Sequence, residues 1–193
     1  MSTFSCVVAT SGPAAAALGK LAPIGVKPTG HALGEKLLVD VPTLEVEVLE
    51  GLARKIVEAT NAPAFILLGQ TSADVYVVEE LSTPGVTRRL EFSRDSEPQW
   101  TLTGAPCSWE ADLHFALPPG ELVDALADFD WTDAELEKVR AAHAAHDVAL
   151  LPRLPPLLRR TFVAFTESLG VDLEHPGATW KPPGLFARLF GRS

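Results

Sequence analysis

The sequence predicts an α+β fold: a mainly antiparallel sheet with helices packed on one face, followed by a helical C-terminal portion. Residues 73–115 carry successive β-rich segments separated by short turn sequences, which is typical of strands joined in antiparallel order. After residue 117 the apolar residues recur at helical spacing instead. We therefore expect one domain, with a sheet-rich part at 1–116, a helical part at 117–170 and a tail at 171–193.

Seven segments alternate between apolar and polar residues or form a short apolar run, and each predicts a strand. These segments are residues 3–10, 36–41, 64–68, 75–80, 86–92, 99–103 and 107–115. Residues 22–35 contain several prolines and glycines, so a loop is expected there.

A helix is predicted from Thr43, a plausible N-cap, to the stop at Asn61 and Pro63. Its apolar stripe consists of Val48, Leu49, Leu52, Ile56 and Val57. An alanine-rich segment at 13–21 could form one or two further helical turns.

Three helices are predicted in the C-terminal portion, at residues 121–129, 132–148 and 157–169. Thr132 and Glu135 form the capping-box pattern Thr-Asp-Ala-Glu, which marks the start of the second of these helices.

Composition limits the classes of function. The chain has 193 residues, and its 16 basic against 25 acidic residues leave a formal charge of -9. This charge disfavours binding to nucleic acid or to an anionic membrane surface. No apolar run is long enough to cross a membrane, and no basic segment precedes the first apolar run as in a secretory signal. We expect a cytoplasmic protein, since its two cysteines do not form a disulfide framework.

No complete catalytic, cofactor or metal motif is present, so no catalytic residue, cofactor or metal ligand is predicted from a motif. The glycine patterns that cradle phosphates, the His-Glu-x-x-His zinc pattern and the Gly-x-Ser-x-Gly nucleophile pattern are all missing from the sequence.

Arg88 interrupts the predicted apolar face of its strand, which it shares with Leu90 and Phe92. A buried guanidinium needs a carboxylate or carbonyl partner. Two interpretations stay open. Either the strand register is shifted slightly or Arg88 reaches water from an edge position, or Arg88 lies in a concave apolar site that receives an anion or a partner's carboxylate.

Glu110, Asp112 and His114 alternate with apolar residues, and we expect them on the charged face of a strand. Carboxylates and imidazole could ligate zinc or perform acid–base chemistry, although a solvated polar face has the same pattern. His143 and His146 share one side of a helix, as two metal ligands or as packing histidines would. Cys107 is expected to pack in the core, since no basic neighbour activates it.

Trp100, Trp109 and Trp180 are candidate anchors for a protein partner, because tryptophan is enriched at interface hot spots. The predicted partner-binding residues are Arg88, Arg89, Glu91, Trp100, Trp109, Glu110 and Asp112.

The run from Gly85 to Asp95, followed by Trp100, Gly104, Pro106 and the pair Trp109-Glu110, resembles uncharacterised small bacterial proteins of toxin-immunity type. This resemblance covers residues 85–110 and implies a cytoplasmic protein that binds and blocks a toxin.

The function expected is non-catalytic protein binding, with an immunity or inhibitor protein that blocks a basic toxin as its most concrete form. One alternative is a small-molecule or metal-dependent enzyme that uses the Glu110, Asp112, His114 stripe or the His143, His146 pair. A second alternative is a structural subunit that docks through its C-terminal tail.

Overall fold

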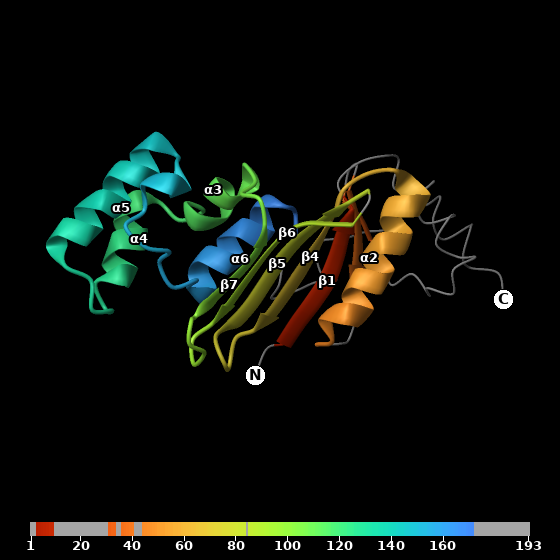
Figure 1. Ribbon diagram of the computed structural model, residues 1–193, viewed down its shortest axis with the longest axis horizontal. Helices are drawn as coiled ribbons and strands as arrows, with labels where there is room; N and C mark the ends of the chain where they lie inside the picture. Colours follow the sequence, from red (N-terminus) through yellow and green to blue (C-terminus); the bar gives the residue numbers. More distant parts are fainter. Residues whose placement is uncertain (1–2, 10–30, 34–35, 41–43, 84, 172–193) are drawn as a thin grey trace.

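A seven-stranded sheet, antiparallel at every pairing, forms the centre of the computed structural model, which confirms the predicted α+β class. The structure describes residues 3–9, 31–33, 36–40, 44–83 and 85–171. The strand order is β2-β3-β1-β4-β5-β6-β7. The strands are β1 (Thr3–Ala9), β2 (His31–Leu33), β3 (Lys36–Asp40), β4 (Ala64–Gln70), β5 (Val75–Ser82), β6 (Gly85–Ser93) and β7 (Trp100–Gly104). Figure 1 shows the sheet running across the molecule.

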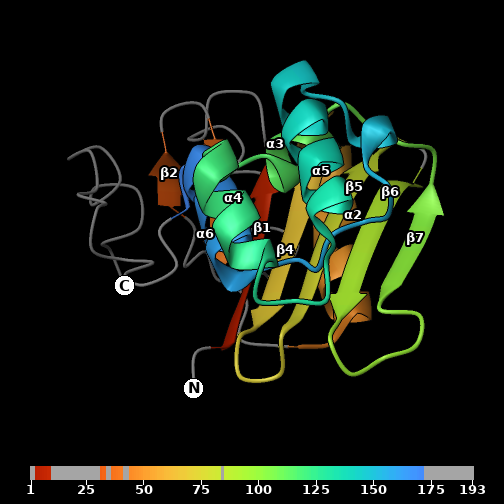
Figure 2. The same cartoon turned by 90° about the vertical axis from the view of Figure 1, so that its left-hand side faces the viewer.

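The helices are α2 (Val46–Thr60), α3 (Trp109–His114), α4 (Pro119–Leu126), α5 (Asp133–Ala145) and α6 (Arg159–Ser168), with a short 3-10 turn η2 (Val148–Leu150). Figure 2 shows α4 and α5 side by side, and Figure 1 shows them at the left-hand end of the molecule, beyond β7. No helix in the described part of the chain is both long and apolar enough to span a membrane.

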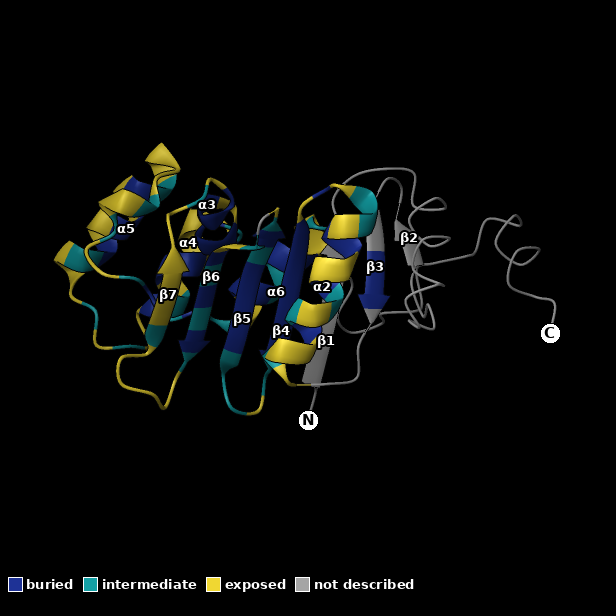
Figure 3. Cartoon of the chain, turned by 45° about the vertical axis from the view of Figure 1, so that its right-hand side comes forward, coloured by how far each residue is buried: buried dark blue, intermediate teal, exposed yellow. Residues whose placement is uncertain are grey.

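Helix α2 covers one face of the sheet, packing on β1, β4 and β5 (Figure 3). Its buried residues are Leu49, Ala53, Ile56 and Val57, so most of the predicted stripe faces the sheet, where it meets Ile66, Leu68 and Val77. Val48 was placed in that stripe but is 47% exposed, because it lies on the outer side of the helix. The helix begins at Val46 with Glu45 as N-cap and ends at Asn61, whose φ of 54° is left-handed.

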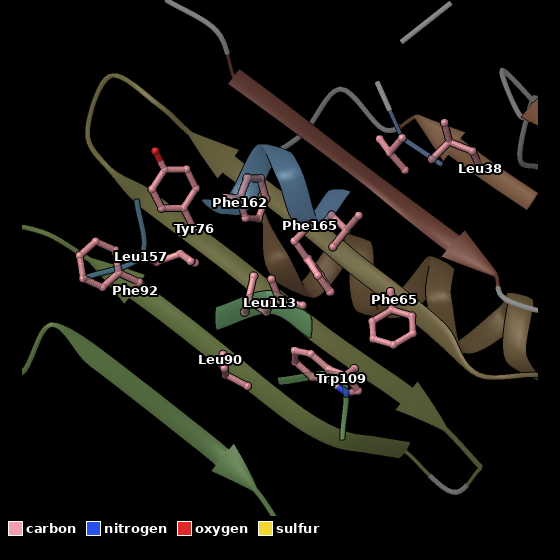
Figure 4. Close-up of a cluster of buried hydrophobic side chains, with 13 residues drawn as sticks. Leu38, Phe65, Tyr76, Leu90, Phe92, Trp109, Leu113, Leu157, Phe162 and Phe165 are labelled. Carbon is pink, nitrogen blue, oxygen red and sulfur yellow. The ribbon is translucent and has the colours of Figure 1, made fainter. Parts of the chain in front are cut away.

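The opposite face of the sheet is also covered, by α3 and α6, so the central strands are apolar on both faces. Figure 4 shows this second core, in which Phe162 and Phe165 of α6 lie against Tyr76, Phe65 and Leu113. Burying a side chain of this size stabilises the fold by about 1.5–3 kcal/mol. The fully apolar run at β4 follows from this arrangement, since its residues meet α2 on one side and α6 on the other.

The segment at 107–115 is helix α3, so the strand predicted there is wrong. In a helix Trp109 and Leu113 share one side, and both join the sheet core. Ala111 and Phe115 belong to a third core, formed with the buried residues of α4 and α5. The short helix therefore joins the helical part to the sheet, a role that a strand could not fill.

The predicted boundaries are close elsewhere, with one addition. His31–Leu33 forms strand β2 inside the predicted loop, because it pairs antiparallel with β3. The capping box at Thr132 and Glu135 is confirmed, with both reciprocal hydrogen bonds present. The predicted helix at 13–21, the N-cap at Thr43 and the tail with Trp180 lie outside the described residues.

Candidate functional site

Arg88 and Glu110 form a buried ion pair between β6 and α3. The Arg88 Nε donates to Glu110 Oε1 at 2.9 Å, and its Nη2 donates to Oε2 at 2.8 Å. Arg88 is 5% exposed and Glu110 3% exposed. The third guanidinium nitrogen, Nη1, donates to the carbonyl of Gly104 at 2.7 Å, so every arm of the fork is bonded. Arg88 therefore does not reach water, and its partners are the chain's own Glu110 and Gly104 rather than a bound anion or the carboxylate of a partner protein.

The Arg88–Glu110 pair holds α3 on the sheet, supported by one local hydrogen bond at the start of α3 and by one further contact to β5. The backbone N–H of Cys107 donates to Glu110 Oε1 at 2.6 Å. The Trp109 Nε1 donates to Glu80 Oε2 at 2.8 Å. These side chains satisfy one another inside the protein, so Arg88, Trp109 and Glu110 do not offer a partner the free surface that was expected of them.

Cys107 is half-buried beside the sheet core, as expected from its apolar neighbours. Burial raises the pKa of its thiol, and the carboxylates of Glu80 and Glu110 add to this effect. A thiol held in its neutral form is a poor nucleophile.

His114 is buried against the ring of Trp100, and its Nε2 has no hydrogen-bond partner. Burial lowers the pKa of the imidazole to about 4. Asp112, in contrast, is exposed on the outer side of α3, where its Oδ1 lies 3.1 Å from His146 Nε2. The expected stripe of Glu110, Asp112 and His114 is therefore divided between two sides of a helix.

His143 and His146 both pack against the ring of Phe115, as packing histidines would, and their Nε2 atoms have different partners. The Nε2 of His143 lies 2.8 Å from the carbonyl oxygen of Leu117, while His146 ends α5 in a left-handed conformation and faces Asp112. Within the described residues, no group of three or more His, Cys, Asp or Glu side chains could hold a metal ion.

A second charged cluster lies on the other face of the sheet, at the border of α2. Arg89 Nη2 lies 2.7 Å from Glu91 Oε2, Nη1 lies 3.6 Å from Glu50 Oε1, and Nε lies 3.9 Å from Glu79 Oε2. Three carboxylates thus share one guanidinium. We call Glu50, Glu79, Arg89 and Glu91 the Arg89 cluster.

Glu79 is the unusual member of the Arg89 cluster. It is 0% exposed, and neither carboxyl oxygen has a hydrogen-bond partner among the residues that the structure describes. Its pKa is raised to about 7, mainly by burial and also by the Glu50 carboxylate, while Arg89 and Arg54 oppose the shift. Like Arg88, Glu79 is a charged residue at an apolar-face position of its strand, on the same face as Val77. The sequence therefore contained a signal for Glu79, although neither Glu79 nor Glu50 is among the predicted site residues.

Beside the Arg89 cluster, β6 and β7 present a face that α2 meets only at its border, through the ion pair of Glu50 with Arg89. Thr87, Thr101 and Thr103 are exposed there, with Arg89 and Glu91 half-buried between them. Figure 3 shows the mostly exposed strand β7 beside β6, which is partly buried, and the mostly buried β5. We call Thr87, Arg89, Glu91, Thr101 and Thr103 the open sheet face. Strand β7 ends the sheet, and its outer backbone edge pairs with no other strand in the described part of the chain.

Trp100 lies at the start of β7 but turns to the opposite face, toward Phe92 and His114. Its Nε1 donates to the carbonyl of Pro155 at 3.1 Å, which ties the segment before α6 to the edge of the sheet. It is half-buried, so it contributes to the fold while keeping part of its ring in solvent.

A pocket of about 390 Å³ lies at the turn between β6 and β7, where Phe129 and Leu158 line it with charged residues of both signs. Arg94 in this pocket is held by Asp74 at 3.0 Å and lies 6.0 Å from the centre of the Phe129 ring. Two aspartates and two arginines line it, so it favours neither anions nor cations.

Comparison of the chain with protein-family models, with curated proteins and with solved structures finds no match.

Proposed function

We propose that this chain is a non-catalytic protein-binding protein whose partner docks on the open sheet face and along the edge of β7. The observation that carries the proposal is the uncovered face of two strands beside α2. Their charged side chains are already arranged at the surface, and the outer backbone of β7 is unpaired in the described structure.

Strand β7 is suited to accept a strand from another protein. Edge strands are often protected from pairing by charged residues, prolines or bulges, and Trp-Thr-Leu-Thr-Gly has none of these. A partner strand added here would gain backbone hydrogen bonds, with specificity supplied by the alternating side chains. Leu102, 44% exposed on the other face of β7, would be covered by the same event.

Charge indicates the kind of partner. The chain carries a formal charge of -9, and the Arg89 cluster has three carboxylates for one guanidinium. Complementary charge speeds encounter and selects against acidic competitors. A basic protein is the partner that fits. The most concrete form of this function is a cytoplasmic immunity or inhibitor protein that blocks a basic toxin, in keeping with the resemblance of residues 85–110.

A site-specific crosslinking experiment tests this proposal. A photo-reactive residue placed at Thr103 should capture the partner in cells, whereas the same residue at exposed Asp124 on α4 should not. The captured protein, once identified and purified, should be basic and should lose affinity for Glu91→Lys but not for Asp124→Lys. Equal capture at both positions, or equal affinity of both variants, would contradict docking on the open sheet face.

A further inference from the structure

The Arg89 cluster has an excess of negative charge that the protein itself does not neutralise. The charged groups facing Glu79 are Glu50 and Arg54 from α2 and Arg89 from β6, while β4 places apolar Ile66 opposite it. Glu91 completes the set through its bond to Arg89. Counting Arg54 together with the Arg89 cluster, three carboxylates and two guanidiniums leave one net negative charge.

The member of the cluster whose charge is least compensated is Glu79, as the contacts of its carboxyl group show. Both Glu79 oxygens and the Arg89 Nε lack hydrogen-bond partners, although Glu79 Oε2 points toward Arg89 at 3.9 Å. A buried carboxylate without partners is costly, so it either takes up a proton or acquires a cation. Its pKa of about 7 means that a proton partly fulfils this role in the free protein.

We propose that the Arg89 cluster is the seat of one basic side chain, a lysine or arginine, of the protein that docks on the open sheet face. This inference rests on the proposed function, and it specifies which kind of side chain the partner places at the border of the open sheet face. Arg89 is the movable part, because it is shared by three carboxylates and its side chain is 25% exposed.

The partner's basic side chain forms ion pairs with Glu50 and Glu91 at the surface, and the Arg89 side chain moves to pair with Glu79. One cation brings the cluster to zero charge, which is also what one proton does. The two therefore compete, and seating the basic side chain expels the proton of Glu79.

The test uses side-chain analogues, so it does not depend on finding the partner. The carbon-13 signal of the Glu79 carboxyl group is followed by NMR near neutral pH while n-butylammonium or methylguanidinium is added. We expect a saturable shift toward the ionised form and a lower apparent pKa for Glu79. Tetramethylammonium, which cannot donate a hydrogen bond, should cause no saturable shift at the same ionic strength.

Two variants make the outcome specific. In Glu79→Gln, which has no Glu79 carboxyl signal, analogue binding followed through backbone amide shifts should be independent of pH. In Glu91→Gln, which removes a carboxylate bonded to Arg89 from the half-exposed rim, the saturable shift of the Glu79 carboxyl signal should weaken several-fold. If the analogues act no differently from tetramethylammonium, the seat is overturned, while crosslinking at Thr103 still decides the proposed function separately. If the analogues bind but Thr103 captures no partner, the docking proposal fails instead.

Discussion

Arg88 on β6 and Glu110 on α3 are 22 residues apart in the chain and meet in a two-pronged ion pair with almost no access to water. The pair attaches α3 to the sheet, and α3 in turn carries residues of both the sheet core and the helical core. The connection between the two parts of the protein therefore depends on two buried charges that must be present together.

Removing one member of this ion pair should lower the free energy of unfolding much more than removing both members. Arg88→Met or Glu110→Leu leaves an uncompensated buried charge, and we expect each to lower the free energy of unfolding by about 3–5 kcal/mol. The double variant should be more stable than either single one. Urea unfolding of the four proteins measures this, and additive losses would contradict the coupling of Arg88 with Glu110.

The position of Arg88 on the buried face could be predicted from sequence, because strand alternation placed it with Leu90 and Phe92. Its partner could not. Trp109, Ala111, Leu113 and Phe115 alternate as in a strand, yet Trp109 and Leu113 also have the four-residue spacing of a helix. Over so short a segment both periods fit, and the strand interpretation turned Glu110 away from Arg88.

The capping box shows when a local pattern is sufficient. Thr132 and Glu135 satisfy each other's backbone within four residues, so no distant contact was needed to predict the start of α5. Cover on both faces of the sheet depended on contacts between distant segments, such as Phe162 with Tyr76, and a single sequence does not reveal them.

Gly104 should be intolerant of even the smallest side chain. Its φ is 82°, a Cβ there would overlap the carbonyl oxygen of Thr87, and its own carbonyl accepts from Arg88. We expect Gly104→Ala to destabilise the protein by more than about 1 kcal/mol. Gly51→Ala is the matched control, because Gly51 lies in α2 with open space around its Cα, and it should be stabilising by about 0.5–1 kcal/mol. Thermal unfolding of both variants provides the comparison. Similar shifts in Tm for the two variants would contradict a special requirement for glycine at position 104.

His114 should make the fold sensitive to acid. Its folded pKa of about 4 lies below the ordinary 6.5, so the unfolded chain binds the extra proton first, and stability falls as pH drops from about 6.5 to about 4. The loss is on the order of 3 kcal/mol. His114→Phe keeps a ring against Trp100 but does not titrate. The difference in unfolding free energy between this variant and the natural protein should therefore change over that range, and a constant difference would mean that His114 is not buried in its neutral form.

Glu79 should make the fold less stable as the pH rises, which is the opposite of the effect expected for His114. Its folded pKa of about 7 lies above the ordinary 4.5, so the folded protein holds a proton that the unfolded chain has released, and stability is lost as pH rises from about 4.5 through about 7. Glu79→Gln removes the titration while keeping the shape of the side chain. Its stability relative to the natural protein should rise over this range by an amount on the order of 3 kcal/mol and level off above it. Glu91→Gln, on the half-exposed rim of the same cluster, should show no comparable rise. Urea unfolding across the pH series measures both variants. Because Glu79 lies on β5 and faces α2, a flat profile for Glu79→Gln would show that its carboxyl group is hydrated, which would also remove the basis for a cation seat at the Arg89 cluster.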